Sequence, residues 1–199
     1  METCKKNLLF IYLRVLMFLS YQVSDVSCAT DTISTNQPLT GVQTIVSSGD
    51  IFELGLFNPA PAPGNYRLYI GIWYKQITPQ TVVWVGNRES PAPEIESYNC
   101  SLKIVDGNLI LYDYIYNETI WSTGVNSSRS KDVQAVLLDS GNLVLRDGTN
   151  SSAHVLWQSF DHPSDTWLPG SKLEFGSKLL TSWKSLIDPS PGRYSLEGP

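Results

Sequence analysis

The sequence has few of the residues that catalysis and metal binding require. Two histidines and three cysteines occur among 199 residues, which is too few for a typical zinc centre. Ser159, Asp161 and His162 include the residue types of a nucleophilic triad, but such near neighbours on a strand or turn point in different directions. The sequence has no glycine-rich phosphate loop and no Gly-x-Ser-x-Gly elbow. We therefore expect no enzyme activity, no metal and no cofactor.

Charge is also scarce. Charged residues make up 17% of the chain and the net charge is −5. Without a basic stripe to neutralise phosphates, a nucleic-acid partner is not expected. No segment has a hydrophobic stripe of helical period that would suit a helix bundle. The 14 glycines and 12 prolines instead fit a turn-rich, all-β chain.

Residues 1–29 have the pattern of a secretory signal peptide. They combine a basic start, the apolar run Leu8–Leu19 with one arginine inside it, and small residues at Ser27–Ala29. The apolar run is too short to span a membrane comfortably. The alternative is a cytosolic chain with an apolar N-terminus. Four glycosylation sequons favour the secretory route, and they lie at Asn99, Asn117, Asn126 and Asn150. We expect a secreted, extracellular glycoprotein.

Removal of the signal peptide would leave Cys100 as the only cysteine of the mature chain. One thiol cannot form a disulfide scaffold, so the apolar core must hold the fold. Two alternatives remain for Cys100, because an odd thiol in a secreted protein is either buried and free or paired with another chain.

A short pattern recurs along the chain. The segments Lys103–Asp113 and Leu137–Asp147 share the core Gly-Asn-Leu-(Ile/Val)-Leu, in which a turn precedes an alternating strand. Leu109, Leu111 and Asp113 should lie on one face of this strand, with Ile110 and Tyr112 on the other. A degenerate first copy is expected at Gly49–Leu54.

Each copy is followed by an apolar residue and a tryptophan. The three pairs are Ile72-Trp73, Ile120-Trp121 and Leu156-Trp157. Three such units imply similar hairpins around one axis. The tryptophans are expected to fill a shared centre rather than stack on sugars.

Six motifs, in the same order, resemble the ectodomain of plant S-domain (G-type lectin) receptor-like serine/threonine kinases and the related S-locus glycoproteins. These motifs are Phe52–Phe57, Ile70–Lys75, Val82–Pro91, Asp139–Arg146, Trp157–Thr166 and Leu180–Lys184. After the signal peptide expected at 1–29, the resemblance implies a bulb-type (mannose-binding type) lectin domain at 30–154. That lectin would have the all-β, β-prism II fold, with three four-stranded sheets about a pseudo-threefold axis. The truncated beginning of an S-locus glycoprotein-like β domain would follow at 155–199.

The resemblance also implies where a sugar would bind. Mannose-binding relatives carry Gln-x-Asp-x-Asn-x-Val-x-Tyr in each sheet, a set of hydroxyl-binding groups around one apolar contact. The middle copy here has Ile104 in place of the Gln, and one lost hydrogen bond costs about 1 kcal/mol. The candidate carbohydrate-binding residues are Asp106, Asn108, Ile110 and Tyr112 in the middle copy and Asn142 and Val144 in the third. The alternative is that Asp106, Asn108, Asp139 and Asn142 are turn residues that satisfy nearby backbone.

The function that the resemblance implies is extracellular recognition of a carbohydrate or protein ligand. Full-length relatives are single-pass plasma-membrane receptor kinases, some of which act in recognition of pollen and others in defence, but their kinase motifs are absent from this chain. The expected partners are a mannose-type glycan or a small secreted protein, and a homodimer or a heterodimer with S-domain receptor kinases. The alternatives are a functional mannose-binding lectin and a non-functional truncated gene product.

Overall fold

A computed structural model describes residues 30–59, 67–93, 99–126, 132–150, 152–171 and 178–198. The predicted signal peptide lies outside the described residues. Apart from short 3-10 turns such as η2 (Ser159–Asp161), the regular elements of these ranges are β-strands. The expectation of an all-β protein is therefore confirmed.

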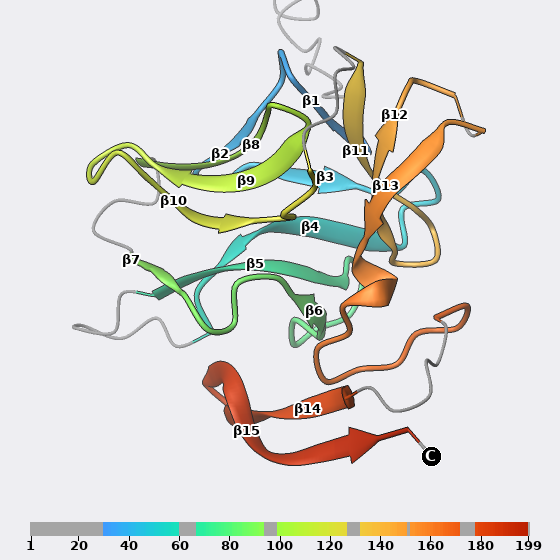
Figure 1. Ribbon diagram of the computed structural model, residues 1–199. Coiled ribbons are helices and arrows are strands. Elements are labelled where there is room, and N and C mark those ends of the chain that lie inside the picture. Colours follow the sequence, from blue (N-terminus) through green and yellow to red (C-terminus); the bar gives the residue numbers. More distant parts are fainter. Residues whose placement is uncertain are drawn as a thin grey trace, which may run out of the picture.

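Three antiparallel sheets form a prism (Figure 1). The first sheet is β3 (Thr44–Val46), β4 (Phe52–Phe57), β5 (Arg67–Tyr74) and β6 (Val82–Val85), with β7 (Ala92–Pro93) added beside β5. The middle sheet is β2 (Leu39–Thr40), β8 (Cys100–Val105), β9 (Asn108–Asp113) and β10 (Glu118–Ser122). The third sheet is β1 (Thr32–Ser34), β11 (Val133–Leu137), β12 (Leu143–Asp147) and β13 (His154–Gln158).

The N-terminal stretch of the domain ties the three sheets together. In succession, β1 pairs with β11 of the third sheet, β2 with β8 of the middle sheet and β3 with β4 of the first sheet. Each sheet thus consists of one N-terminal strand followed by three strands that are consecutive in sequence. The predicted three-unit architecture of four-stranded sheets is confirmed, and β7 is an addition to it.

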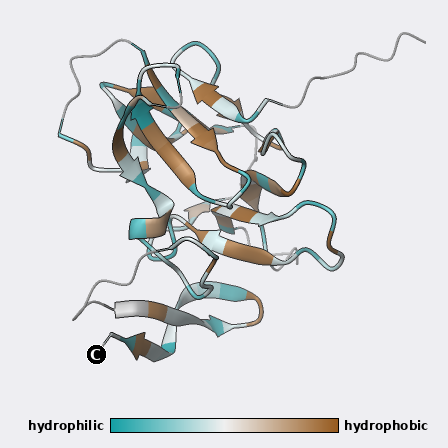
Figure 2. Cartoon of the chain, turned by 90° about the vertical axis from the view of Figure 1, so that its right-hand side faces the viewer, coloured by the Kyte–Doolittle hydropathy of each residue, from teal (hydrophilic) through white to brown (hydrophobic). Residues whose placement is uncertain are grey.

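Alternation along the strands places the core between the sheets. The inward residues of the three central strands are almost completely buried, and they are Ile70, Ile72, Leu109, Leu111, Leu143 and Leu145. Figure 2 shows the hydrophobic colour concentrated on the strands of the prism. The predicted face of β9 is confirmed, because Asp113 is also buried whereas Tyr112 is only half-buried.

Three tryptophan rings meet where the sheets converge. The rings of Trp84, Trp121 and Trp157 contact one another edge to face. Their centroids are 6.0–6.4 Å apart, and the three interplanar angles lie between 68° and 79°. Each tryptophan belongs to the last strand of its sheet. The three contacts are nearly equal in distance, as a pseudo-threefold arrangement of the sheets requires. The expectation that the repeat tryptophans fill a shared centre is confirmed for Trp157, which is buried, and for Trp121, which is partly buried against the core. Trp84, which the repeat did not include, is buried with them.

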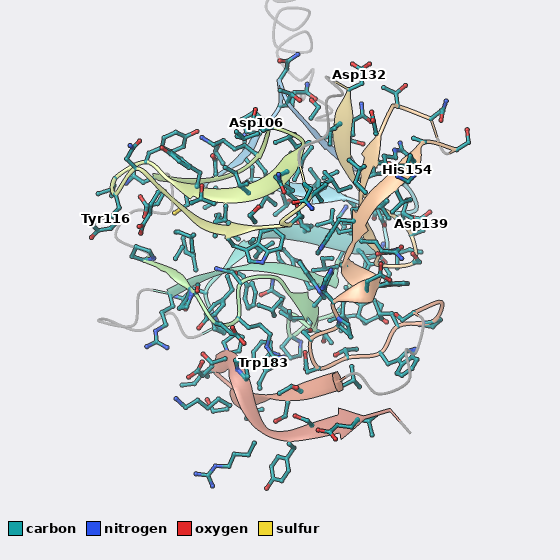
Figure 3. All side chains as sticks on the ribbon, viewed as in Figure 1. Asp106, Tyr116, Asp132, Asp139, His154 and Trp183 are labelled. Carbon is teal, nitrogen blue, oxygen red and sulfur yellow. The ribbon has the colours of Figure 1, made fainter. Side chains whose placement is uncertain are left out.

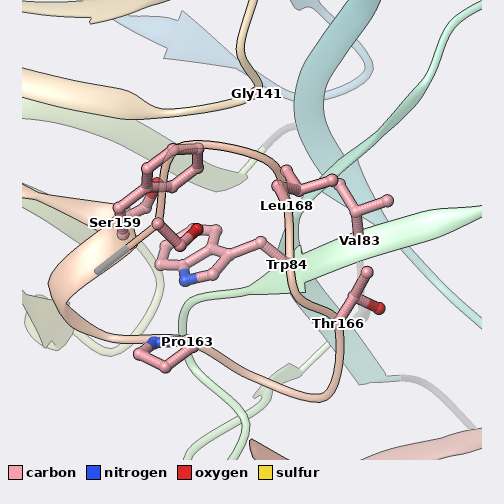
Figure 4. Close-up of a pocket in the computed structure, with 9 residues that line it drawn as sticks. Val83, Trp84, Gly141, Ser159, Pro163, Thr166 and Leu168 are labelled. Atoms are coloured by element: carbon pink, nitrogen blue, oxygen red, sulfur yellow. The ribbon is translucent and has the colours of Figure 1, made fainter. Parts of the chain in front are cut away.

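The Trp84 ring is also covered by the chain that follows η2 (Figure 4). Its Nε1 donates a hydrogen bond of 2.8 Å to the carbonyl oxygen of His162, and Ser159 and Leu168 lie near the same ring. The space left there is about 10 Å³, enough for about one water molecule. This region is therefore part of the core and not a ligand pocket.

Two assignments made from the first repeat were wrong. The third tryptophan of the centre is Trp84 and not Trp73. The segment Gly49–Leu54 leads into β4, which is the second strand of its sheet, as β8 and β11 are of theirs. The repeated pattern of the other two sheets leads into their third strands, β9 and β12, and the third strand of the first sheet is β5. Trp73 lies on the outward face of β5, because its inward neighbours Ile70 and Ile72 are the residues that the core requires.

The C-terminal hairpin packs on the first sheet. It consists of β14 (Lys178–Ser185) and β15 (Asp188–Glu197), and Figure 1 shows it beneath β5 and β6. Trp183 of β14 approaches Phe57, with ring centroids 6.4 Å apart, and Figure 3 shows Trp183 between the hairpin and the prism. The predicted boundary between two domains at residues 154 and 155 remains a prediction.

Candidate functional site

The outward faces of the three sheets differ. On the first sheet this face is covered, because Phe57, Tyr69, Trp73 and Val85 are buried and form a cluster against Trp183. The paired residues Gly55 and Gly71 make room for it. A Cβ on Gly71 would lie 2.5 Å from the ring of Phe57, and one on Gly55 would lie 3.1 Å from the ring of Trp73. This face binds the C-terminal hairpin and leaves no sugar site.

The third sheet uses its candidate residues internally. Asn142 is 6% exposed, and its Nδ2 donates to Oε1 of Gln158 over 2.9 Å. Its Oδ1 accepts hydrogen bonds from the hydroxyl of Ser159 and the backbone N–H of Phe160, both at 3.2 Å. Val144 is also 6% exposed. The Asn142 amide therefore holds the junction of β13 and η2 in place.

Asn108 does the same in the middle sheet. Its Oδ1 accepts from the backbone N–H of Val125 over 2.6 Å and from the Thr123 hydroxyl over 3.2 Å. Its Nδ2 donates to the carbonyl oxygen of Val125 over 2.8 Å. Asn108 and Asn142 thus clamp the chain that leaves the last strand of their sheets. The alternative interpretation of these residues as structural groups fits this geometry.

Asp106 remains exposed. It forms the β8–β9 turn with Gly107, and both residues have positive φ, 49° and 78°, as a tight hairpin turn requires. Figure 3 shows Asp106 at one end of the middle sheet. Ile104 stands at the position where mannose-binding relatives have glutamine. It pairs with Leu109 and packs in the core, so this position offers no sugar contact beside Asp106.

A cluster of long side chains covers the outward face at the other end of β9. The ammonium of Lys103 lies 3.6 Å from the ring centroid of Tyr112 and 4.6 Å from that of Tyr114. The two tyrosine rings are in T-shaped contact at 5.1 Å. Ile110, paired with Lys103, lies beneath the cluster and is 8% exposed. We call Lys103, Ile110, Tyr112 and Tyr114 the tyrosine face.

Hydrogen bonds fix the two hydroxyls of the tyrosine face. The Tyr114 hydroxyl accepts from Ser101 over 3.2 Å and from Lys103 over 3.4 Å. The Ser101 bond, with help from Lys103, lowers the pKa of the Tyr114 phenol. The Tyr112 hydroxyl donates to Oδ1 of Asn117 over 2.5 Å. Because Asn117 follows β9 and Asp106 precedes it, the Tyr112 side chain points away from Asp106.

The structure therefore divides the candidate residues of the middle copy. Tyr112 and Ile110 belong to the tyrosine face, whereas Asp106 and Asn108 lie at the opposite end of β9. Lys103 and Tyr114 were missed by the motif, which covers only alternate positions from Ile104 to Tyr112. Their signal in the sequence is weak: Lys103 is on the neighbouring strand, and only the hairpin register places it opposite Ile110.

The four sequons differ in exposure. Asn117, Asn126 and Asn150 are exposed. Asn99 is half-buried, and the next two residues of its sequon, Cys100 and Ser101, are 1% and 0% exposed. The structure thus favours glycans on Asn117, Asn126 and Asn150 over a glycan on Asn99. Whether each is glycosylated remains a prediction.

The Cys100 thiol is buried at the start of β8. Burial, together with the nearby carboxylate of Asp113, raises its pKa from the ordinary value of 9.0 to about 11. Of the two alternatives for this thiol, the buried and free one is the arrangement found.

The described part of the chain gives no support for a metal site, a membrane-spanning helix or a Ser159–His162 catalytic pair. No group of three or more His, Cys, Asp or Glu residues there could hold a metal ion. No helix among those residues is both long and apolar enough to cross a membrane. The Ser159 hydroxyl is hydrogen-bonded to Asn142, and the His162 ring stacks on Trp157 at 5.2 Å. These contacts give both residues structural roles.

Comparisons with known proteins agree with this architecture. The family described as D-mannose binding lectin matches residues 81–184. A G-type lectin S-receptor-like serine/threonine-protein kinase of Arabidopsis thaliana is 62% identical over 99% of this chain and 26% of its own length. A second such kinase of that plant is 53% identical over 86% of this chain and 21% of its own length. The chain thus spans about a quarter of the length of these relatives.

Two solved lectins share a more distant likeness. A monomeric monocot mannose-binding lectin from Gastrodia elata is 18% identical and gives a TM-score of 0.46, covering 65% of this chain and 96% of the lectin. A Marasmius oreades lectin is 16% identical and gives a TM-score of 0.44, covering 65% of this chain and 90% of the lectin.

Proposed function

Because the chain belongs to the D-mannose binding lectin family, we propose that it is a non-catalytic extracellular recognition module whose ligand face is the outward face of the middle sheet. The ligand is a mannose-type glycan. The first-sheet face is covered by the hairpin, and the Asn142 amide of the third sheet is engaged within the protein. The observation that carries the proposal is the tyrosine face, where Lys103 and Tyr112 are half-buried and Tyr114 is exposed.

The chemistry of this face suits a sugar. Tyrosine rings offer apolar surface to the C–H groups of a pyranose, and the phenol and ammonium groups can bind its hydroxyls. Asp106 lies in the turn before β9, beyond the four extended steps from Asn108 to Tyr112, which span about 13 Å. Asp106 therefore offers a second acceptor for the far end of an oligosaccharide, while Asn108 and Ile110 shape the surface between them.

A glycan array tests this proposal. The full chain is secreted from a eukaryotic host, its own N-glycans are removed enzymatically, and binding to mannose-type oligosaccharides is measured. Two variants probe the two ends of β9. Asp106→Gly keeps the positive φ that the turn requires, and Tyr112→Ala removes the central ring of the tyrosine face. Loss of binding in Tyr112→Ala but not in Ser34→Ala, a change on the third sheet, is expected. A folded protein that binds no glycan would contradict the proposal.

A protein ligand is the second candidate. The β9–β10 turn exposes Tyr114, Ile115 and Tyr116 to 52%, 50% and 56%, and Figure 3 shows Tyr116 at the outer tip of the middle sheet. Exposed aromatic and aliphatic groups are common at the centre of protein interfaces. If the array is silent, a small secreted protein captured by the wild type and lost in Ile115→Asp would support this candidate.

The location and wider role follow from the same proposal. The predicted secretory signal at 1–29 and the exposed sequons at Asn117, Asn126 and Asn150 suit an extracellular module. In a complete receptor of the S-domain type, such a module would lie outside the plasma membrane and report ligand binding to a kinase domain. A dimer with itself or with S-domain receptor kinases is part of this proposal, and size-exclusion chromatography with and without glycan tests it.

A further inference from the structure

Asn117 occupies a rigid turn beside the tyrosine face. The turn joins β9 to β10, and the buried carboxylate of Asp113 accepts hydrogen bonds from the backbone N–H groups of Ile115 and Tyr116 at 2.7 and 3.2 Å. Asn117 itself has a φ of 54°, a conformation that asparagine tolerates better than most residues. Its position relative to β9 is therefore fixed.

The amide of Asn117 is also oriented. Its Oδ1 accepts the hydrogen bond of 2.5 Å from the Tyr112 hydroxyl. Nδ2, the atom that would carry a glycan, belongs to the same planar amide, so its position beside Tyr112 is set by this bond. The sequon threonine, Thr119, lies directly opposite Tyr112 in the β9–β10 register and is exposed. Both ends of the Asn117–Thr119 sequon thus flank the same tyrosine.

We propose that the N-linked glycan of Asn117 lies on the tyrosine face of its own chain and occupies it as an internal ligand. Attachment joins Nδ2 to the anomeric carbon of a lipid-linked oligosaccharide. The bond from that carbon to the donor's diphosphate breaks, and Nδ2 loses one proton. The first N-acetylglucosamine then packs its apolar face on Tyr112 and places its polar groups near Lys103. This inference rests on the proposed secretory route and on the proposed ligand face.

Asn150 is bonded differently, to residues of its own loop. The side chain of Asn150 accepts a hydrogen bond from Ser152, and its carbonyl oxygen accepts one from the N–H of Ala153. A glycan on Asn150 would therefore extend into solvent. This difference within one molecule supplies an internal reference for a test.

The consequence is that the glycan of Asn117 competes with external ligands. A chain that carries it should bind a mannose-type glycan more weakly than a chain that lacks it. Thr119→Ala separates the two states, because it removes the sequon and leaves both Asn117 and Tyr112 in place. Occupancy of one sequon would thereby regulate ligand binding.

Site-resolved deglycosylation tests the inference. The secreted full chain is treated with peptide N-glycosidase in its native state, and mass spectrometry follows the glycans of Asn117 and Asn150 separately. Release from Asn117 is expected to be about 10-fold slower than release from Asn150, and the two rates should become equal after unfolding. In Tyr112→Ala the rate at Asn117 should rise to that at Asn150, whereas Tyr116→Ala, a change at the exposed tip of the same turn, should leave it unchanged.

The outcomes separate this inference from the proposed function. An unoccupied Asn117, or equal native rates at the two sites in the wild type, would overturn the internal ligand. Slow release that Tyr112→Ala does not accelerate would overturn it as well. Circular dichroism of each variant shows that it is folded, and Tyr112→Phe, which keeps the ring, should retain protection. If the protection is found but the glycan-free chain binds nothing on the array, the internal ligand stands and the proposed function fails.

Discussion

Arg88 and Pro189 connect the prism to the C-terminal hairpin. The Nε of Arg88 donates to the carbonyl oxygen of Pro189 over 2.6 Å, and its two other nitrogens donate to the carbonyl oxygens of Thr181 and Ser182 over 2.9 and 2.8 Å. The residue is 9% exposed. Burial lowers the pKa of its guanidinium, against the opposing effect of the acidic neighbour Asp165. One planar donor group thus satisfies three carbonyls on both strands of the hairpin.

Replacing Arg88 should release the hairpin. Arg88→Ala leaves three carbonyl oxygens without their donor, and hydrogen bonds to charged groups contribute about 1.5–3 kcal/mol each. We expect backbone amides of β14 and β15 to exchange hydrogen at least about 10-fold faster, the factor that 1.4 kcal/mol corresponds to. The amides of β9 should exchange as before. Arg88→Lys should give only partial protection, because an ammonium lacks the planar fork.

The control for this prediction is Arg193→Ala. Arg193 lies on the hairpin itself and is exposed, so its loss should not alter exchange in β14. Unchanged protection of the hairpin in Arg88→Ala would mean that the packing of Trp183 on Phe57 is sufficient to hold it.

The central tryptophans should dominate stability. Trp84 is 5% exposed and packs against Trp121 and Trp157, so Trp84→Ala should lower the free energy of unfolding by about 3–5 kcal/mol. Trp84→Phe keeps most of the apolar volume but leaves the His162 carbonyl oxygen without its donor, and should cost about 1–3 kcal/mol. Urea unfolding followed by circular dichroism measures both changes. Trp167→Phe is the control, since Trp167 is 38% exposed.

Strand periodicity explains what the sequence predicted well. The turns at Asp106 and Ser140 are each followed by the same alternation of residues. Because the core needs large aliphatic residues at the inward positions, Leu109 and Leu143 could be assigned to the core from the sequence. The first repeat was harder to align. Only its inward residues are constrained by the core, while its outward positions, Gly71 and Trp73, serve the hairpin that covers them.

The roles of the asparagines could not be predicted from the sequence. An asparagine at the start of β9 or β12 suits a sugar hydroxyl as well as a backbone clamp, and the choice depends on partners far along the chain. For Asn108 the partner is Val125 and for Asn142 it is Phe160. Arg88 poses the same difficulty, because its acceptors lie about 90 residues or more away in sequence.

A pair of variants distinguishes the structural asparagine from the exposed turn residue. Asn142→Ala leaves the buried Ser159 hydroxyl and Phe160 N–H without their acceptor, which should lower the free energy of unfolding by about 1–3 kcal/mol. Asp106→Gly should change it by less than about 0.5 kcal/mol, since the side chain is exposed and glycine suits a positive φ. Thermal and urea unfolding of both variants measure the difference. The structural role of Asn142 would be refuted by a variant as stable as the wild type.

Cys100 should be unreactive while the protein is folded. Only the thiolate attacks disulfide reagents, and burial raises the pKa of this thiol to about 11. At pH 8 the folded chain should therefore react with a disulfide reagent far more slowly than the same chain in urea. Rapid labelling of the native protein, or a dimer that a reducing agent dissociates, would contradict the buried free thiol.

The same thiol makes stability depend on alkaline pH. Its folded pKa lies above the ordinary value, so between pH 9.0 and about pH 11 the unfolded chain loses this proton while the folded chain keeps it. The unfolded state then binds fewer protons, and stability falls as the pH rises through that window. Cys100→Ala removes the titrating group and fits the same apolar site. We expect urea unfolding midpoints of the wild type to fall more steeply with pH in this window than those of Cys100→Ala. Parallel pH profiles would show that Cys100 does not control alkaline stability.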